Sequence, residues 1–173
     1  DPTSGTTRDR KYGKSVWIDR QFTVIDTGGW ITKSDDTFEA AIRAQVEISI
    51  EEADLILFMV DIGVGVTDLD LDIANLLRRS GKPVMVVCNK VDTSAHDVGS
   101  SEFYSLGLSD QIFSISANNG FGTGELLDEL VNTLPVEPEE EEGRLPRLAV
   151  VGRPNVGKST LIKTLSGVHK ATT

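Results

Sequence analysis

The residues with the clearest chemical signature form a glycine-rich stretch near the end of the chain, Gly152-x-x-x-x-Gly157-Lys158-Ser159. This stretch follows an apolar segment, 148–151, that is typical of a strand, and it precedes a helical pattern. Glycines let backbone amides approach phosphates closely, and a helix start adds a favourable field for anions. Lys158 can reach the β- and γ-phosphates of a nucleotide, and Ser159 can hold magnesium. The spacing predicts a phosphate-binding loop; the alternative is a plain glycine turn.

Two further motifs could complete a phosphate and magnesium site. The sequence DTGG at 26–29 ends a predicted strand region, so that Asp26 would hold magnesium through water and the Gly29 amide would meet the γ-phosphate. A turn after a strand is often rich in Asp and Gly without any such role. Near the start of the chain, the hydroxyl of Thr7, or failing that of Thr6, could complete the magnesium shell. The alternative for this segment is a basic, solvated loop.

A second pair of motifs has the chemistry to recognise a guanine base. NKVD at 89–92 follows an apolar segment, and the carboxylate of Asp92 can accept from N1–H and the 2-amino group of guanine. Adenine has no such pair of donors, so a buried carboxylate discriminates strongly against it. The sequence Ser116-Ala117-Asn118 follows the next predicted strand and could lie behind the guanine O6.

The elements that must position these motifs alternate along the chain. We expect an exposed loop over 1–14, one long strand or a strand pair over 15–25, and further strands over 55–61, 84–88, 111–115 and 148–151. Helical spacing covers 36–52, 68–79, 124–134 and 158–165, with a short helix near 100–106. This order predicts an α/β fold with a mostly parallel central sheet. Each motif falls at the carboxyl end of a strand, where such sheets bind ligands.

The composition limits the partners that we expect. The 173 residues include 27 acidic and 17 basic ones, for a net charge of −10, which argues against broad electrostatic binding to DNA. The single cysteine, Cys88, excludes a disulfide framework and fits a cytoplasmic location. No apolar run approaches the roughly 20 residues of a membrane span. We therefore expect a cytoplasmic protein that acts without membrane or DNA partners.

Taken together, the motifs resemble those of the translation-factor-related GTPases, and most of all the bacterial tandem GTPases of the EngA/Der family. The resemblance rests on GTTRDR at 5–10, DTGG, NKVD, SAN, an acidic linker, and PRLAVVGRPNVGKST at 146–160. It implies a P-loop NTPase fold of the Ras-like G-domain type, binding of GTP and GDP with Mg²⁺, and GTP hydrolysis. It also implies that the parent protein acts in assembly of the large ribosomal subunit. A non-catalytic GDP-binding fragment and a related tRNA-modifying type of GTPase remain alternatives.

The resemblance also implies a role for potassium. Trp30 stands where many GTPases have a glutamine that orients the attacking water, and Asn155 matches a P-loop asparagine that is linked to potassium binding. The implied catalytic residues are Lys158, Thr7, Gly29 and Asn155, and the implied metal ligands are Ser159, Thr7 and Asp26 for Mg²⁺ and Asn155 for K⁺. The implied nucleotide-binding residues are Gly152, Asn155, Val156, Gly157, Lys158, Ser159, Thr160, Asp26, Gly29, Asn89, Lys90, Asp92, Ser116, Ala117 and Asn118.

The order of the motifs departs from that of a standard G domain, because the P-loop comes last. We divide the chain into a G domain without its own first strand and P-loop (1–136), an acidic linker (137–144) and a strand–P-loop–helix unit (145–173). The chain is either a piece of a tandem protein, which the acidic linker favours, or a circular permutant. In both cases 148–151 is the one predicted strand that can fill the gap in the sheet. We expect it to dock in cis in a monomer, with a domain-swapped dimer as the alternative.

Overall fold

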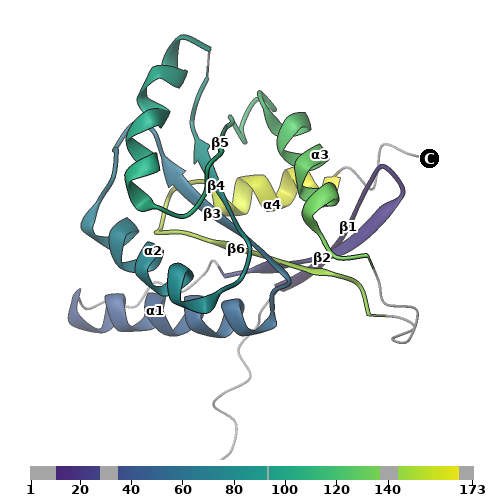
Figure 1. Cartoon of the computed structure of the whole chain (residues 1–173), viewed down its shortest axis with the longest axis horizontal. Coiled ribbons are helices and arrows are strands. Elements are labelled where there is room, and N and C mark those ends of the chain that lie inside the picture. Colours follow the sequence, from purple (N-terminus) through teal and green to yellow (C-terminus); the bar gives the residue numbers. More distant parts are fainter. Residues whose placement is uncertain (1–10, 28–34, 93, 137–143, 168–173) are drawn as a thin grey trace, which may run out of the picture.

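A six-stranded sheet with helices on both faces organises the computed structural model, which describes residues 11–27, 35–92, 94–136 and 144–167 (Figure 1). The strand order is β1-β2-β6-β3-β4-β5, and every neighbouring pair is parallel except β1 and β2. The strands are β1 (Lys11–Trp17), β2 (Arg20–Asp26), β3 (Leu55–Asp61), β4 (Val84–Asn89), β5 (Ile112–Ser114) and β6 (Arg147–Val151). The helices are α1 (Asp35–Glu52), α2 (Asp68–Ser80), α3 (Thr123–Thr133) and α4 (Lys158–Gly167), together with a 3-10 helix, η1 (Ser94–Leu106). The predicted α/β fold with a mostly parallel sheet is confirmed.

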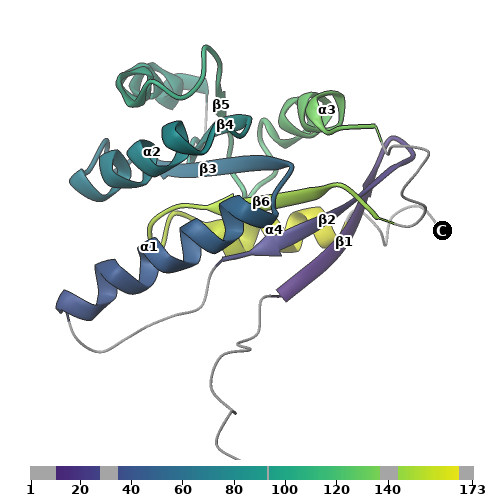
Figure 2. The same cartoon turned by 60° about the horizontal axis from the view of Figure 1, so that its bottom comes forward.

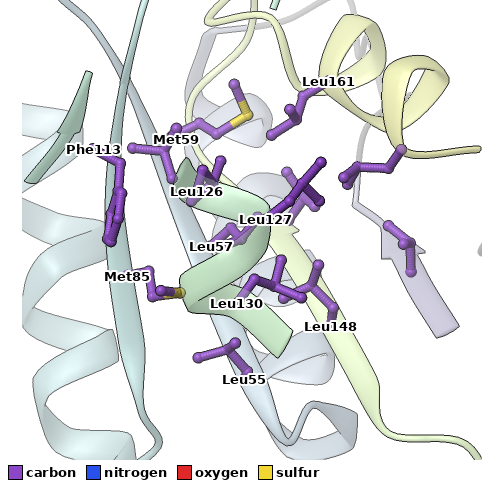
Figure 3. Packing of buried hydrophobic residues seen from close by; sticks show 14 of the residues in the cluster. Leu55, Leu57, Met59, Met85, Phe113, Leu126, Leu127, Leu130, Leu148 and Leu161 are labelled. Carbon is purple, nitrogen blue, oxygen red and sulfur yellow. The ribbon is translucent and has the colours of Figure 1, made fainter. Parts of the chain in front are cut away.

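The two faces of the sheet carry separate hydrophobic cores. Successive side chains of a strand point to opposite faces, so β3, which is buried along its whole length, contributes to both cores. Leu55, Leu57 and Met59 pack with α3 and α4 on one face (Figure 3). Ile56 and Phe58 pack with α1, α2 and η1 on the other face. Figure 2 shows these two helical layers from a second direction. The segment 55–61 is almost entirely apolar because both of its faces are buried, as its sequence pattern predicted.

The last strand in the sequence lies in the interior of the sheet. β6 pairs with β2 on one side and with β3 on the other, so that Ala149 lies beside both Ile25 and Ile56. Two further backbone bonds extend this pairing, from Thr23 N–H to the Pro146 carbonyl (2.7 Å) and from Asp54 N–H to the Arg147 carbonyl (2.8 Å). Without β6, the inner edges of β2 and β3 would lack partners, and unpaired edges are costly to leave open.

The region 11–26 is a β-hairpin, which corrects the expectation that residues 1–14 form a loop: β1 begins at Lys11. Of the two alternatives for 15–25, the strand pair is the observed one. The turn consists of Ile18 and Asp19, whose φ angles are 46° and 61°. Tight hairpin turns of this kind favour Asn and Gly, so the sequence offered no strong turn signal. Arg20 anchors the hairpin, because its guanidinium donates to the carbonyls of Val131, Leu134 and Pro135 at the end of α3.

The other helices and strands begin and end close to their predicted limits, with two differences. The short helix expected near 100–106 is a longer 3-10 helix, Ser94–Leu106, and the strand expected over 111–115 covers only Ile112–Ser114. In the part of the chain that the structure describes, none of the helices has both the length and the apolar character needed to cross a bilayer.

Candidate functional site

The loops that carry the sequence motifs lie along one edge of the sheet. β2, β6, β3, β4 and β5 run parallel, so their carboxyl ends face the same way. The register places Asp26 of β2 opposite Val150 of β6, and Asp61 of β3 opposite Asn89 of β4. The loop after β6 therefore starts in the interior of this edge, with the β2 motif on one side and the β4 motif on the other. This is the edge at which α/β sheets bind ligands.

The loop from Gly152 to Gly157 has a backbone that only certain residues can adopt. Gly152, Asn155 and Gly157 have φ angles of 151°, 63° and 103°. A Cβ atom on Gly152 would lie 2.5 Å from the carbonyl oxygen of Met59, and one on Gly157 would collide with the side-chain amide of Asn89. Both glycines are therefore required by close approach as well as by conformation. The loop leads directly into α4, whose first residue is Lys158.

Lys158 lies against the loop with most of its side chain buried. It is 9% exposed, and its Nζ donates to the carbonyls of Gly152 and Arg153 at 2.8 Å each. Burial lowers the pKa of Lys158 to about 8; the Asp26 carboxylate opposes this shift, and the Arg153 guanidinium adds to it. A phosphate entering the loop would restore a counter-charge to this ammonium group.

Asn89 joins the phosphate loop to the loop after β5. Its side chain is buried, its Nδ2 donates to the Val156 carbonyl (2.7 Å), and its Oδ1 accepts from the Ala117 N–H (2.9 Å). Both ends of the amide are thus used, one on each loop. Val156 itself is buried in the hydrophobic core, so its contribution to the edge is its backbone.

The two motifs with base-recognition chemistry also meet. The Ser116 hydroxyl donates to Asp92 Oδ1 (3.1 Å), and the Thr164 hydroxyl of α4 lies 3.4 Å from the Ala117 carbonyl. Asp92 and Asn118 are exposed at the surface of this edge. NKVD and SAN, which are far apart in the sequence, therefore form one continuous rim beside the phosphate loop.

Two of the residues predicted to bind magnesium, Ser159 and Asp26, have oxygen atoms that could hold this ion. Ser159 is exposed at the start of α4. Asp26 ends β2 near enough to Lys158 for its charge to oppose the lowering of the Lys158 pKa. Hydroxyl and carboxylate oxygens suit Mg²⁺, which keeps several waters and needs few protein ligands. Thr27 extends the β2 loop toward β6, because its hydroxyl donates to the Val150 carbonyl (2.6 Å). Thr160 is exposed in the first turn of α4.

The remaining predicted site residues, Thr7, Gly29 and Trp30, lie outside the described residues, as does the linker segment 137–143. Their predicted roles stay predictions.

Two aspartates at this edge, Asp61 and Asp70, were not predicted from the sequence. Asp61 Oδ2 lies 2.6 Å from Lys90 Nζ, and Asp70 Oδ2 lies 3.5 Å from Arg153 Nε. Asp61 had a signal, since it ends an apolar strand just as Asp26 does. Asp70 had only the pattern Thr-x-x-Asp before a helix, which marks a capping box and gives no hint of a contact with the phosphate loop.

Replacing Asn89 by alanine is expected to lower the free energy of unfolding by about 2–6 kcal/mol, because two buried backbone groups lose their partners at about 1–3 kcal/mol each. Urea denaturation without nucleotide measures this loss. Asn132→Ala, at an exposed position of α3, is the matched control and is expected to stay within about 0.5 kcal/mol of the parent. An Asn89→Ala protein as stable as the control would contradict the bridging role.

Comparison with known proteins identifies the family. A family model described as 50S ribosome-binding GTPase matches residues 1–90 and 147–173. The chain is 55% identical over 167 residues to GTPase Der of Christiangramia forsetii, 54% over 165 residues to that of Phocaeicola vulgatus, and 52% over 172 residues to that of Cytophaga hutchinsonii. These alignments cover 96%, 95% and 99% of this chain but only 38%, 38% and 39% of the relatives, so the chain spans well under half of their length. The family match extends over both the phosphate loop and the strand that ends in Asn89, and the chain therefore belongs to the 50S ribosome-binding GTPases.

Proposed function

We propose that this chain binds GTP and GDP and hydrolyses GTP. The proposal depends most on the two hydrogen bonds of the Asn89 side chain. One is to Val156 in the phosphate loop, and the other is to Ala117 in the loop after β5. Because one side chain spans both loops, the phosphates and the base of a single nucleotide would meet them at a fixed separation. The family match and the name GTPase Der of the relatives support the same activity.

Guanine recognition is assigned to the rim formed by NKVD and SAN. Asp92 supplies the carboxylate for N1–H and the 2-amino group, and the Ser116 hydroxyl that donates to it holds this carboxylate in place. Ala117 and Asn118 lie next along the chain, at the position expected behind the guanine O6. ATP lacks the two donors that Asp92 would accept, so it would leave this carboxylate unpaired.

Hydrolysis is the attack of water on the γ-phosphate with release of GDP, and negative charge spreads over the phosphoryl oxygens as it proceeds. We assign Lys158, the first residue of α4, and the amides at the start of this helix to stabilise that charge. We assign Ser159, Asp26 and Thr7 to hold magnesium and the Gly29 amide to meet the γ-phosphate. A magnesium ion held there would neutralise negative charge on the phosphates.

We further propose that hydrolysis is stimulated by potassium. Trp30 cannot accept a hydrogen bond from the attacking water, unlike a glutamine. Asn155 offers an exposed side-chain amide oxygen from the loop and has a left-handed backbone at φ 63°. A potassium ion at this oxygen would supply positive charge beside the phosphates.

We infer that residues 145–173 complete a G domain with residues 1–136 of the same chain, across the acidic linker 137–144. The pairing of β6 with both β2 and β3 supports this arrangement. Two chains that exchange this unit would make the same contacts as a dimer, and either a tandem fragment or a circular permutant is compatible with them. For a protein of the relatives' full length that contains this chain, we propose a cytoplasmic role in assembly of the large ribosomal subunit, in keeping with the family description.

The first test is a titration with a fluorescent GDP analogue, competed by GTP and by ATP, together with the mass in solution. We expect a monomer that GTP displaces at concentrations at least about 100-fold lower than ATP does, since unpaired polar groups in a site reject the wrong ligand by such factors. The same selectivity in a dimer would indicate an exchanged P-loop unit. Absence of binding, or equal competition by ATP, would contradict the proposed function.

Potassium dependence is tested by phosphate release from GTP under single-turnover conditions. We expect faster release in potassium chloride than in sodium chloride at equal ionic strength, and loss of the difference in Asn155→Ala. Lys163→Ala, at an exposed position of α4, is the control and should keep the difference. Normal GDP binding with no release in either salt would instead support a non-catalytic GDP-binding module.

The lowered pKa of Lys158 predicts proton uptake on nucleotide binding. With a pKa of about 8, roughly a tenth of the free protein lacks this proton at pH 7 and roughly three quarters at pH 8.5, while the phosphate-bound form keeps it. Uptake is therefore expected to rise from about 0.1 to about 0.75 proton per GDP over this range, and affinity should fall correspondingly. Calorimetry in buffers of different ionisation enthalpy measures the uptake.

Two variants control this measurement. Lys163→Met, on the exposed side of α4, should leave the rise in proton uptake intact, whereas Lys158→Met should abolish it. An uptake that stays constant from pH 7 to 8.5 in the parent chain would show that Lys158 is already fully protonated or deprotonated in the free protein.

A further inference from the structure

The segment that connects β3 to α2, residues 61–70, contains none of the nucleotide-binding motifs, yet it contacts both halves of the site. At its start, Asp61 pairs with Lys90, which belongs to the NKVD motif proposed to recognise the base. At its end, Asp70 pairs with Arg153, which belongs to the phosphate loop. A single short segment thus supplies a carboxylate to each of the two nucleotide-binding loops.

The contact between Asp61 and Lys90 is short, and the carboxylate in it is buried. Asp61 is buried, with its side chain 5% exposed, and both of its oxygens are engaged: Oδ2 by Lys90 Nζ at 2.6 Å and Oδ1 by the Gly63 N–H at 2.9 Å. Lys90 is half exposed and has a left-handed backbone, with φ 70°. The buried Asp61 carboxylate therefore holds the Lys90 ammonium group in one position, whereas an unpaired lysine side chain would move through solvent.

The contact on the phosphate side reaches Lys158 through the backbone. Asp70 is fully buried, and its Oδ2 also accepts from the N–H (3.0 Å) and the hydroxyl (2.7 Å) of Thr67, so the start of α2 holds it rigidly. Arg153 reaches this carboxylate with its side chain, while its own carbonyl accepts from Lys158 Nζ. Arg153 thus links Asp70 of α2 to Lys158, the lysine proposed to bind phosphate.

The Asp70–Arg153 pair is poorly suited to a role in stability alone. Asp70 Oδ1 and the Nε and Nη2 atoms of Arg153 are buried and have no hydrogen-bond partner within the described residues. A buried ion pair with incomplete hydrogen bonding seldom contributes net folding free energy, because desolvation offsets the attraction. Its more direct consequence is that it fixes the loop relative to α2.

We propose that Asp61 and Asp70 are positioning residues for the nucleotide: Asp61 fixes Lys90 on the nucleoside side, and Asp70 fixes Arg153 and with it the phosphate loop. This inference rests on the proposed binding of guanine nucleotides. Through these two contacts, the 61–70 segment keeps the NKVD loop and the phosphate loop at the spacing that one nucleotide requires.

Two double-mutant cycles test the proposal by GDP affinity. Asp61→Asn keeps an acceptor for Gly63 but removes the charge, and we expect it to weaken GDP binding about tenfold in the parent and less than twofold in a Lys90→Met background. Asp70→Asn should likewise lose about tenfold in the parent and less than twofold in an Arg153→Met background. Asp68→Asn, an exposed carboxylate in the first turn of α2, controls for net charge and should change affinity less than twofold.

Pyrophosphate competition separates the two halves of the site. Asp70→Asn should weaken pyrophosphate binding about as much as GDP binding, whereas Asp61→Asn should leave pyrophosphate affinity unchanged. A variant that merely loosens the fold would not produce this split, and urea denaturation of the same variants records any effect on folding separately.

The outcomes distinguish this inference from the proposed function. If the parent chain binds GDP with guanine selectivity but each aspartate variant weakens GDP equally in both backgrounds, or has no effect, the positioning role is overturned and the nucleotide function stands. If the parent chain does not bind GDP at all, the proposed function fails and the positioning role fails with it.

Discussion

The site depends first on the two hydrogen bonds of the Asn89 side chain. A carboxamide is one of the few side-chain groups that both donates and accepts in fixed directions, and here the donor is used on Val156 and the acceptor on Ala117. Both bonds are buried, where an unpaired polar group is costly, so the loops cannot separate or slide without losing them. The same contact explains why residue 157 is glycine: any side chain there would occupy the space of the Asn89 amide.

Asn89 reaches both loops only because of the sheet around it. β6 lies next to β3, and β3 next to β4, so the phosphate loop after β6 and the Asn89 side chain at the end of β4 are near neighbours. This adjacency is a property of strand order in space and not of order along the chain. A parallel strand that comes late in the sequence can therefore still complete the sheet and the site at its carboxyl edge. Its side chains must fill both cores, as Leu148 and Ala149 do.

The charges along this edge follow a common arrangement. Among the described residues of this edge, three cations lie close to a carboxylate from a neighbouring strand or helix: Lys158 near Asp26, Lys90 beside Asp61, and Arg153 beside Asp70. In the nucleotide complex that we propose, these carboxylates would hold the cations in place, while backbone amides of the loop and of the α4 start would face the phosphates. A chain with a net charge of −10 can in this way present a local site for an anion.

Elements with a local sequence pattern could be predicted before the structure was known. The apolar runs 55–61 and 84–88 predicted buried strands, and the glycine spacing at 152–157 predicted the loop between β6 and α4, because period and turn chemistry are written into neighbouring residues. β1 was missed before residue 15 because a polar edge strand owes its structure to pairing with β2 and lacks an apolar period of its own. Tertiary structure alone decided that Asp61 meets Lys90 and that Asp70 meets Arg153. Those contacts join residues far apart in the chain, and they exist only because the packed sheet brings the ends of its strands, and the start of α2, to one edge.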